Sequence, residues 1–281
     1  MHAQPHGGSL VSLSTGSADH GSRRPVFCVH AVSGSAAVYS VLASALAPEF
    51  QVHAIQAAGL EAGGVPHTSV EEMASAYLAV MDNELGPVNE YLLCGWSMGG
   101  VVSFELARLL ERRGDAARVA MIDTQFPTPF AEPPSTAAFT RWYMRDVTAS
   151  LGSPMSAFAA DFDRLSQAER LGTLLDHLKL GRGGDREWWL GEMQRRFEVF
   201  RANLMAATEY RPRPVSAEVL LVQSSQDALP VSGWEPVIRG RLTRVEVPGN
   251  HYTMLAGDGV GPVSALVAKH FSGPARRFEL A

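Results

Sequence analysis

The alternation of short apolar runs with helical segments is the feature of this sequence that most constrains its fold. Apolar runs typical of strands lie at residues 26–29, 51–55, 91–95, 118–123, 217–222 and 242–247. The segments 38–46, 69–85, 101–113 and 260–271 instead have the pattern of helices. Strands and helices that alternate at this spacing predict an α/β fold, with a mostly parallel sheet covered by helices on both faces.

The alternation is interrupted once, between about residue 127 and residue 214. This stretch has no strand pattern and consists of helical segments rich in Leu, Phe, Trp, Met and Arg. We therefore predict a helical insertion over 127–214, which at the carboxyl edge of such a sheet can act as a lid over a ligand. The Gly/Ser/His-rich residues 1–23 are predicted to be a flexible leader or linker, 24–272 the folded domain and 273–281 a tail.

Composition excludes several classes of protein. The 281 residues are 46% hydrophobic and 19% charged, with a formal net charge of -5, which is typical of a globular domain. Because the sequence has no block of Lys and Arg, we expect neither a nucleic-acid nor a membrane partner. No run reaches the ~18 apolar residues of a membrane span. Cys28 and Cys94 lie in apolar runs without metal-ligand spacing, so we expect buried free thiols, no metal site and a reducing, cytoplasmic location.

The segment Gly95-Trp96-Ser97-Met98-Gly99 matches the G-x-S-x-G pattern of a nucleophile elbow. It directly follows an apolar strand and opens a helix, which is the context that the pattern requires. A serine on a strained turn needs glycines at both flanks, and the N–H groups at the start of the helix then point at a developing oxyanion. The sequence therefore predicts that Ser97 is the nucleophile of a serine hydrolase.

A serine nucleophile needs a base and an orienting acid, which in this fold follow in the order Ser, acid, His. His251 is the predicted base, because it lies in a loop directly after the last strand. Two residues are candidates for the acid. Asp123 ends the strand that follows the elbow helix, and Asp227 follows the next strand, which is the commoner position among α/β-hydrolases. Spacing alone does not decide between them.

Several motifs resemble the chain-terminating type I thioesterase domains of nonribosomal peptide and polyketide synthases, members of the α/β-hydrolase superfamily. These motifs are Gly-Trp-Ser-Met-Gly-Gly from residue 95, Met-Ile-Asp-Thr-Gln-Phe-Pro from residue 121 and Pro-Gly-Asn-His-Tyr-Thr-Met-Leu from residue 248. The resemblance covers about residues 23–272. In that family the acid follows the strand after the elbow, so the resemblance implies Ser97, Asp123 and His251 as the catalytic triad.

The resemblance also implies an oxyanion hole made of the backbone N–H groups of Met98 and Val32. The loop that contains Val32 departs from the family's His-Pro-x-Gly-Gly form, because Ala31 and Ser33 replace the proline and the first glycine. His30 in this loop is expected to be structural. The aromatic residues of the insertion (Trp142, Tyr143, Trp188, Trp189 and Phe197) are expected to be mainly core residues.

The implied function is release of an acyl, peptidyl or polyketidyl chain from a carrier protein through an acyl-Ser97 ester, by hydrolysis or macrocyclisation. The chain would need no cofactor of its own, because the phosphopantetheine belongs to an acyl or peptidyl carrier protein, which is the expected partner. Three alternatives stay open: a discrete type II editing thioesterase, a generic carboxylester hydrolase, and an inactive hydrolase fold that serves as a docking module.

Overall fold

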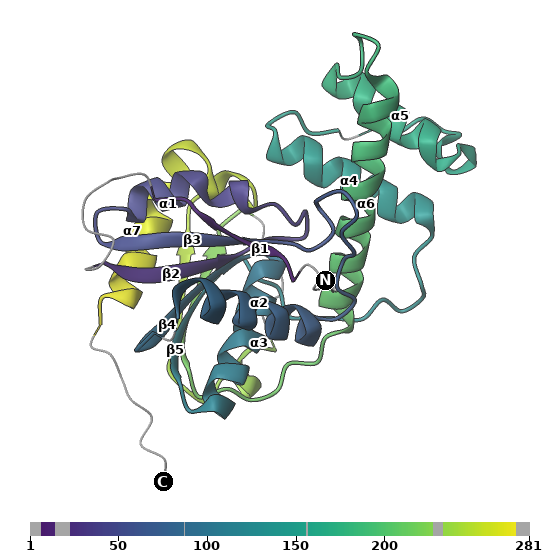
Figure 1. Ribbon diagram of the computed structural model, residues 1–281. Helices are drawn as coiled ribbons and strands as arrows, with labels where there is room; N and C mark the ends of the chain where they lie inside the picture. Colours follow the sequence, from purple (N-terminus) through teal and green to yellow (C-terminus); the bar gives the residue numbers. More distant parts are fainter. Residues whose placement is uncertain (1–6, 15–22, 87, 156, 227–232, 274–281) are drawn as a thin grey trace.

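One mixed sheet forms the centre of the molecule (Figure 1). The computed structural model describes residues 7–14, 23–86, 88–155, 157–226 and 233–273. Within these residues the strands lie in the spatial order β1-β3-β2-β4-β5-β6-β7. They are β1 (Ser9–Ser12), β2 (Arg24–Val29), β3 (Phe50–Gln56), β4 (Glu90–Trp96), β5 (Ala116–Ile122), β6 (Glu218–Ser224) and β7 (Leu242–Val247). β1 pairs antiparallel with β3, and the other neighbours pair parallel, which agrees with the predicted sheet.

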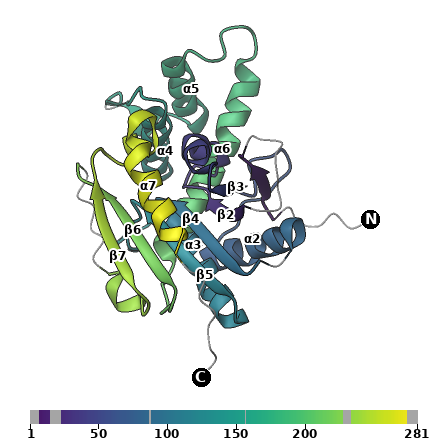
Figure 2. The same ribbon diagram turned by 90° about the vertical axis from the view of Figure 1, so that its left-hand side faces the viewer.

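Helices cover both faces of this sheet. α2 (Val70–Leu85) and α3 (Met98–Arg113) pack on one face, and α1 (Ser40–Leu46) and α7 (Val260–Phe271) pack on the other (Figures 1 and 2). The central strands β4 and β5 are therefore buried at every position, which explains their mostly apolar sequence. Their two charged residues, Glu90 and Arg118, pair with each other. This arrangement brings the carboxyl ends of the parallel strands to a single edge of the sheet.

The predicted insertion consists of helices between β5 and β6. They are α4 (Thr136–Ser150), α5 (Gln167–Leu178) and α6 (Arg186–Glu209), and all three lie within residues 127–214. They extend beyond the sheet (Figure 1) and share a hydrophobic cluster of their own, which includes Tyr143, Phe162 and Phe197. The long helix α6 also packs against α3, so it connects this lid to the body of the molecule.

Strand β1 lies in the segment that was predicted to be a flexible leader. Ser9 to Ser12 pair with β3 in a continuous antiparallel register, from Ser9 opposite Gln56 to Ser12 opposite His53. The prediction is therefore wrong for residues 9–12. The strand is too short to stand out in a Gly/Ser-rich sequence, and it forms because the outer edge of β3 offers unpaired backbone groups. Residues 1–6, 15–22 and 274–281 lie outside the described part of the chain.

Candidate active site

Ser97 occupies a strained turn between β4 and α3. Its backbone has φ 56° and ψ -127°, a conformation that is unfavourable for a residue with a side chain. The Ser97 N–H donates to the Ile122 carbonyl at 2.8 Å, and the Ser97 carbonyl accepts from the Gly100 N–H at 3.1 Å. These bonds hold the turn in place on the edge of the sheet. Strain of this kind is what the elbow pattern predicts.

The glycines on either side of Ser97 are required by close backbone contacts. A Cβ atom on Gly95 would lie 2.1 Å from the carbonyl oxygen of Gly99, and one on Gly99 would lie 2.2 Å from the carbonyl oxygen of Val29. Real Cβ atoms do not approach other atoms this closely. The helix can therefore turn back over the strands only when both positions lack a side chain.

Asp123 and His251 are in direct contact, although they are 128 residues apart in the sequence. Oδ2 of Asp123 lies 2.6 Å from Nδ1 of His251, and Oδ1 of Asp123 accepts from the Ser224 N–H at 2.9 Å. Burial alone would raise the pKa of Asp123, but the hydrogen bonds from His251 and Ser224 outweigh it and lower the pKa below its usual value. Asp123 is therefore a charged acceptor for the imidazole. Asp227, the other candidate acid, lies outside the described residues.

An aromatic residue of the elbow positions the loop of His251. The indole Nε1–H of Trp96 donates to the His251 carbonyl at 3.0 Å, and the two rings lie 4.7 Å apart between centroids. The side chain of Asn250 accepts from the N–H groups of Tyr252 and Thr253, both at 3.0 Å, and so stabilises the turn after the histidine. The imidazole of His251 is therefore held by the Trp96 ring on one side and by the Asp123 carboxylate at Nδ1.

The two predicted oxyanion donors belong to segments that meet beside Ser97. Met98 is the first residue of α3, and Val32 lies in the loop after β2. Within the described residues, no acceptor is hydrogen-bonded to the N–H group of either residue. The side-chain amide of Asn203, on α6, donates to the Val32 carbonyl at 3.0 Å. Asn203 thus holds a loop that lacks the family's proline, and no sequence motif indicated this contact.

His30 has structural contacts, as expected. Its Nε2 atom is 2.6 Å from the Tyr77 hydroxyl, its Nδ1 atom is 2.8 Å from the Ala31 carbonyl, and its side chain is fully buried. Desolvation lowers the pKa of His30 to about 4.

Cys28 and Cys94 are buried free thiols on the neighbouring strands β2 and β4. The prediction of buried free thiols is therefore confirmed.

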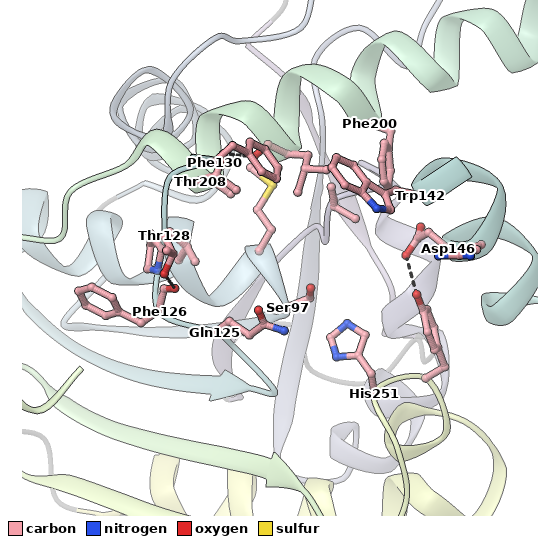
Figure 3. Close-up of a pocket in the computed structure, with 18 residues that line it drawn as sticks. Ser97, Gln125, Phe126, Thr128, Phe130, Trp142, Asp146, Phe200, Thr208 and His251 are labelled. Atoms are coloured by element: carbon pink, nitrogen blue, oxygen red, sulfur yellow. Dashed lines mark hydrogen bonds between the residues drawn. The ribbon is translucent and has the colours of Figure 1, made fainter. Parts of the chain in front are cut away.

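A pocket of about 640 Å³ opens over Ser97 and His251 (Figure 3). Its walls come from the loop after β2, the segment after β5 and the lid helices α4 and α6. The lining residues are Val32, Ser97, Met98, Val101, Gln125, Phe126, Pro127, Thr128, Phe130, Trp142, Arg145, Asp146, Phe200, Leu204, Ala207, Thr208, His251 and Tyr252. Most of these side chains are apolar, so the pocket suits a largely apolar chain with a few polar groups.

The aromatic residues of the lid have different environments. Trp142 lines the pocket, stacked on Phe130 at 5.4 Å between ring centroids. Tyr143 and Phe197 belong to the buried lid cluster, and Trp189 packs against it, as expected for core residues. Trp188 is instead 63% exposed. The expectation of a core role is therefore correct for Tyr143, Phe197 and Trp189 and wrong for Trp188. Trp142 packs against the same cluster and also lines the pocket.

Asp146 is a charged pocket residue that was not identified from the sequence. Asp146, on α4, accepts a hydrogen bond from the Tyr252 hydroxyl at 3.2 Å, so it connects the lid to the residue that follows His251 (Figure 3). Burial raises the pKa of Asp146 to about 6, although Tyr252 and His251 oppose the shift. No motif surrounds Asp146, because its role depends on where α4 lies relative to the loop after β7.

Among the residues that the structure describes, no group of three or more His, Cys, Asp or Glu side chains could hold a metal ion. Nor does any helix in this part of the chain have the length and apolar character needed to cross a membrane.

The sequence matches the Thioesterase domain family over residues 24–270. Among curated proteins, it is 28% identical to atromentin synthetase invA1 of Paxillus involutus over 263 residues, which cover 85% of this chain and 26% of that protein. It is 36% identical to the nonribosomal peptide synthetase btyA of Aspergillus terreus over 95 residues, 34% of this chain and 10% of that protein. A relative named inactive atromentin synthetase invA4, also from Paxillus involutus, is 26% identical over 85% of this chain. The chain thus spans about a quarter or less of these relatives.

Solved structures resemble the chain over nearly its whole length. A four-domain nonribosomal peptide synthetase, solved with AMP and glycine, superposes with a TM-score of 0.82 and 28% identity over 95% of this chain and 20% of that one. The thioesterase domain NocB superposes with a TM-score of 0.66 and 20% identity, covering 94% of this chain and all of that one. The chain therefore belongs to the Thioesterase domain family, and it has the α/β-hydrolase fold of the thioesterase domains that it resembles.

Proposed function

We propose that this chain is a serine thioesterase domain that releases a thioester-bound acyl, peptidyl or polyketidyl chain from a carrier protein. The observation that carries the proposal is the contact between the buried Asp123 and His251, whose imidazole lines the same pocket as Ser97. An acid, an imidazole and a serine on a strained elbow are the parts of a Ser-His-Asp triad. The resemblance to synthetases with several domains supports a carrier protein as the partner.

In the first step, the Ser97 hydroxyl attacks the thioester carbonyl while His251 takes its proton. Asp123 holds Nδ1 of the imidazole and stabilises the imidazolium that forms. The N–H groups of Met98 and Val32 donate to the oxyanion, and each such donor contributes on the order of 3 kcal/mol. When the carbonyl re-forms, the C–S bond breaks, His251 returns the proton to the departing sulfur, and an acyl-Ser97 ester remains.

In the second step, a nucleophile attacks the acyl-Ser97 ester with His251 again as the base. Water as the nucleophile gives the free acid, whereas an amine or hydroxyl of the bound chain gives a ring. Ser97 regains its proton from His251 in either case. The mass of the product distinguishes the two, because a ring is lighter than the acid by one water.

The test compares Ser97→Ala with Ser44→Ala, a change of an exposed serine on α1. We expect Ser97→Ala to abolish labelling by a fluorophosphonate probe and to lower thioester turnover by several orders of magnitude, because the nucleophile is missing. Ser44→Ala is expected to behave as the unmodified chain. Normal labelling of Ser97→Ala would exclude Ser97 as the nucleophile.

The same assays separate the alternative functions. An unmodified chain that neither takes the label nor turns over thioesters would be an inactive docking module, a possibility raised by the relative that is named inactive. A chain that hydrolyses oxygen esters faster than matched thioesters would instead be a general carboxylester hydrolase.

A further inference from the structure

The proposed acyl pocket carries an anionic group that the two chemical steps do not use. Asp146 projects from α4 into the pocket that contains Ser97 and His251 (Figure 3). Most of the other lining residues are apolar. A carboxylate in such surroundings is costly unless donors compensate it, so its presence requires an explanation.

The protein itself supplies few donors to this carboxylate. Within the described residues, the carboxylate of Asp146 has a single hydrogen-bond partner, the Tyr252 hydroxyl, which donates to Oδ1. A carboxylate has about four acceptor positions on its two oxygens. Oδ2 of Asp146 therefore has acceptor capacity that no described protein group fills, and it lines a pocket rather than a closed core.

The neighbouring cation is engaged elsewhere. Arg145 also lines the pocket, but its guanidinium carbon lies 5.4 Å from the centre of the Phe158 ring, and its side chain is exposed to solvent. The contacts described for the two side chains are separate, because Arg145 lies over the Phe158 ring and Asp146 accepts from the Tyr252 hydroxyl. The negative charge of Asp146 is thus available to a ligand in the pocket.

An aromatic ring lies beside the carboxylate. Trp142 is one helical turn before Asp146 on α4, and both side chains line the pocket side by side (Figure 3). A carboxylate next to an indole suits an ammonium group, because the carboxylate accepts its hydrogen bonds and the ring attracts its charge. A carboxylate group on the ligand would instead be repelled.

We propose that Asp146 is a specificity-determining residue that selects acyl chains bearing a protonated amine. The inference rests on the proposed thioesterase function and names the substrate class of the same pocket. The amine lies on the acyl side of the thioester, because Asp146 and Ser97 line one continuous pocket. The Tyr252 hydroxyl orients Oδ1, which leaves Oδ2 for the ligand.

The test uses soluble acyl thioesters in pairs. Both members of a pair have the same chain length, and one ends in an ammonium group where the other ends in a methyl group. Several chain lengths cover the pocket. We expect the unmodified chain to prefer the ammonium member of the best pair by about 10- to 100-fold in kcat/KM, the range typical of a charge-assisted hydrogen bond.

Asp146→Asn is expected to bring this preference close to one. Asp176→Asn is the matched control, because Asp176 is an exposed carboxylate of the lid that pairs with Arg186 outside the pocket. This control is expected to keep the preference. Tyr252→Phe is also expected to keep it, because the variant removes the hydroxyl donor but retains the carboxylate.

Two results would overturn the inference: no preference for the ammonium chain at any length, or a preference that survives Asp146→Asn. The second result can be accompanied by equal losses of kcat/KM for both members of the pair in Asp146→Asn and Tyr252→Phe. Such equal losses would mean that the contact between Asp146 and Tyr252 only holds the lid against the loop after β7. Fluorophosphonate labelling of Ser97 and turnover of the methyl chain report the proposed function separately. If labelling and turnover of the methyl chain are normal and the two members of each pair have nearly equal kcat/KM, the proposed role of Asp146 is wrong and the proposed thioesterase function is unaffected.

Discussion

Asp123 and His251 are 128 residues apart in the sequence, yet Oδ2 of Asp123 lies 2.6 Å from Nδ1 of His251. The whole lid and two strands separate them along the chain. The contact arises because β5 and β7 both end at the edge of the sheet where Ser97 lies. Ser224, at the end of the intervening strand β6, supplies a second donor to the same carboxylate.

Asp123→Asn tests this contact directly. The amide retains the size of the side chain but cannot hold the imidazole in the required tautomer, so we expect kcat to fall by about 10⁴-fold. Asp227→Asn is the matched control and is expected to leave kcat within a few-fold of its original value. The measurement is steady-state turnover of an acyl thioester. A large loss in Asp227→Asn alone would favour the arrangement of a discrete editing thioesterase.

Asn203→Ala tests the Val32 oxyanion donor. The substitution removes the hydrogen bond to the Val32 carbonyl, so the loop after β2 is held less firmly and its N–H is less well placed. We expect kcat to fall by about 10-fold with little change in KM, because the oxyanion exists only in the transition state. Gln194→Ala, also on α6 but bonded to Glu198 instead, is the control. An unchanged kcat in Asn203→Ala would argue against Val32 as a donor.

The buried His30 predicts a loss of stability in mild acid. Because desolvation lowers the pKa of His30 from its usual 6.5 to about 4, the folded protein binds this proton less readily than the unfolded chain. Its contribution to the free energy of unfolding is full above pH 6.5 and decreases as the pH falls towards 4, by roughly 3 kcal/mol in total.

Urea denaturation at pH 7, 6, 5 and 4 measures this effect. His30→Gln keeps a polar group near Tyr77 but cannot be protonated in this range, so its stability should fall less steeply with pH than that of the unmodified chain. Equal slopes for the two proteins would show that His30 does not cause the loss.

Local signals were sufficient for much of the fold and for part of the site. A strand that leads directly into Gly95-Trp96-Ser97-Met98-Gly99 defines a turn that few other residues could form, because Cβ atoms on Gly95 or Gly99 would overlap backbone. The alternating strands and helices and the family prediction are confirmed. The roles of Ser97, Asp123 and His251 stay predictions, for which the contact between Asp123 and His251 is the structural support.

The sequence by itself determined most of the elements, the elbow and the family, because each depends on residues that are close together in the chain. Only the tertiary structure decided that Ser9–Ser12 extend the sheet, that Asn203 holds the Val32 loop and that Asp146 enters the pocket. These contacts join segments up to 171 residues apart. The residues that make these contacts belong to no recognisable motif. Their roles depend on how helices and strands pack rather than on their neighbours in the sequence.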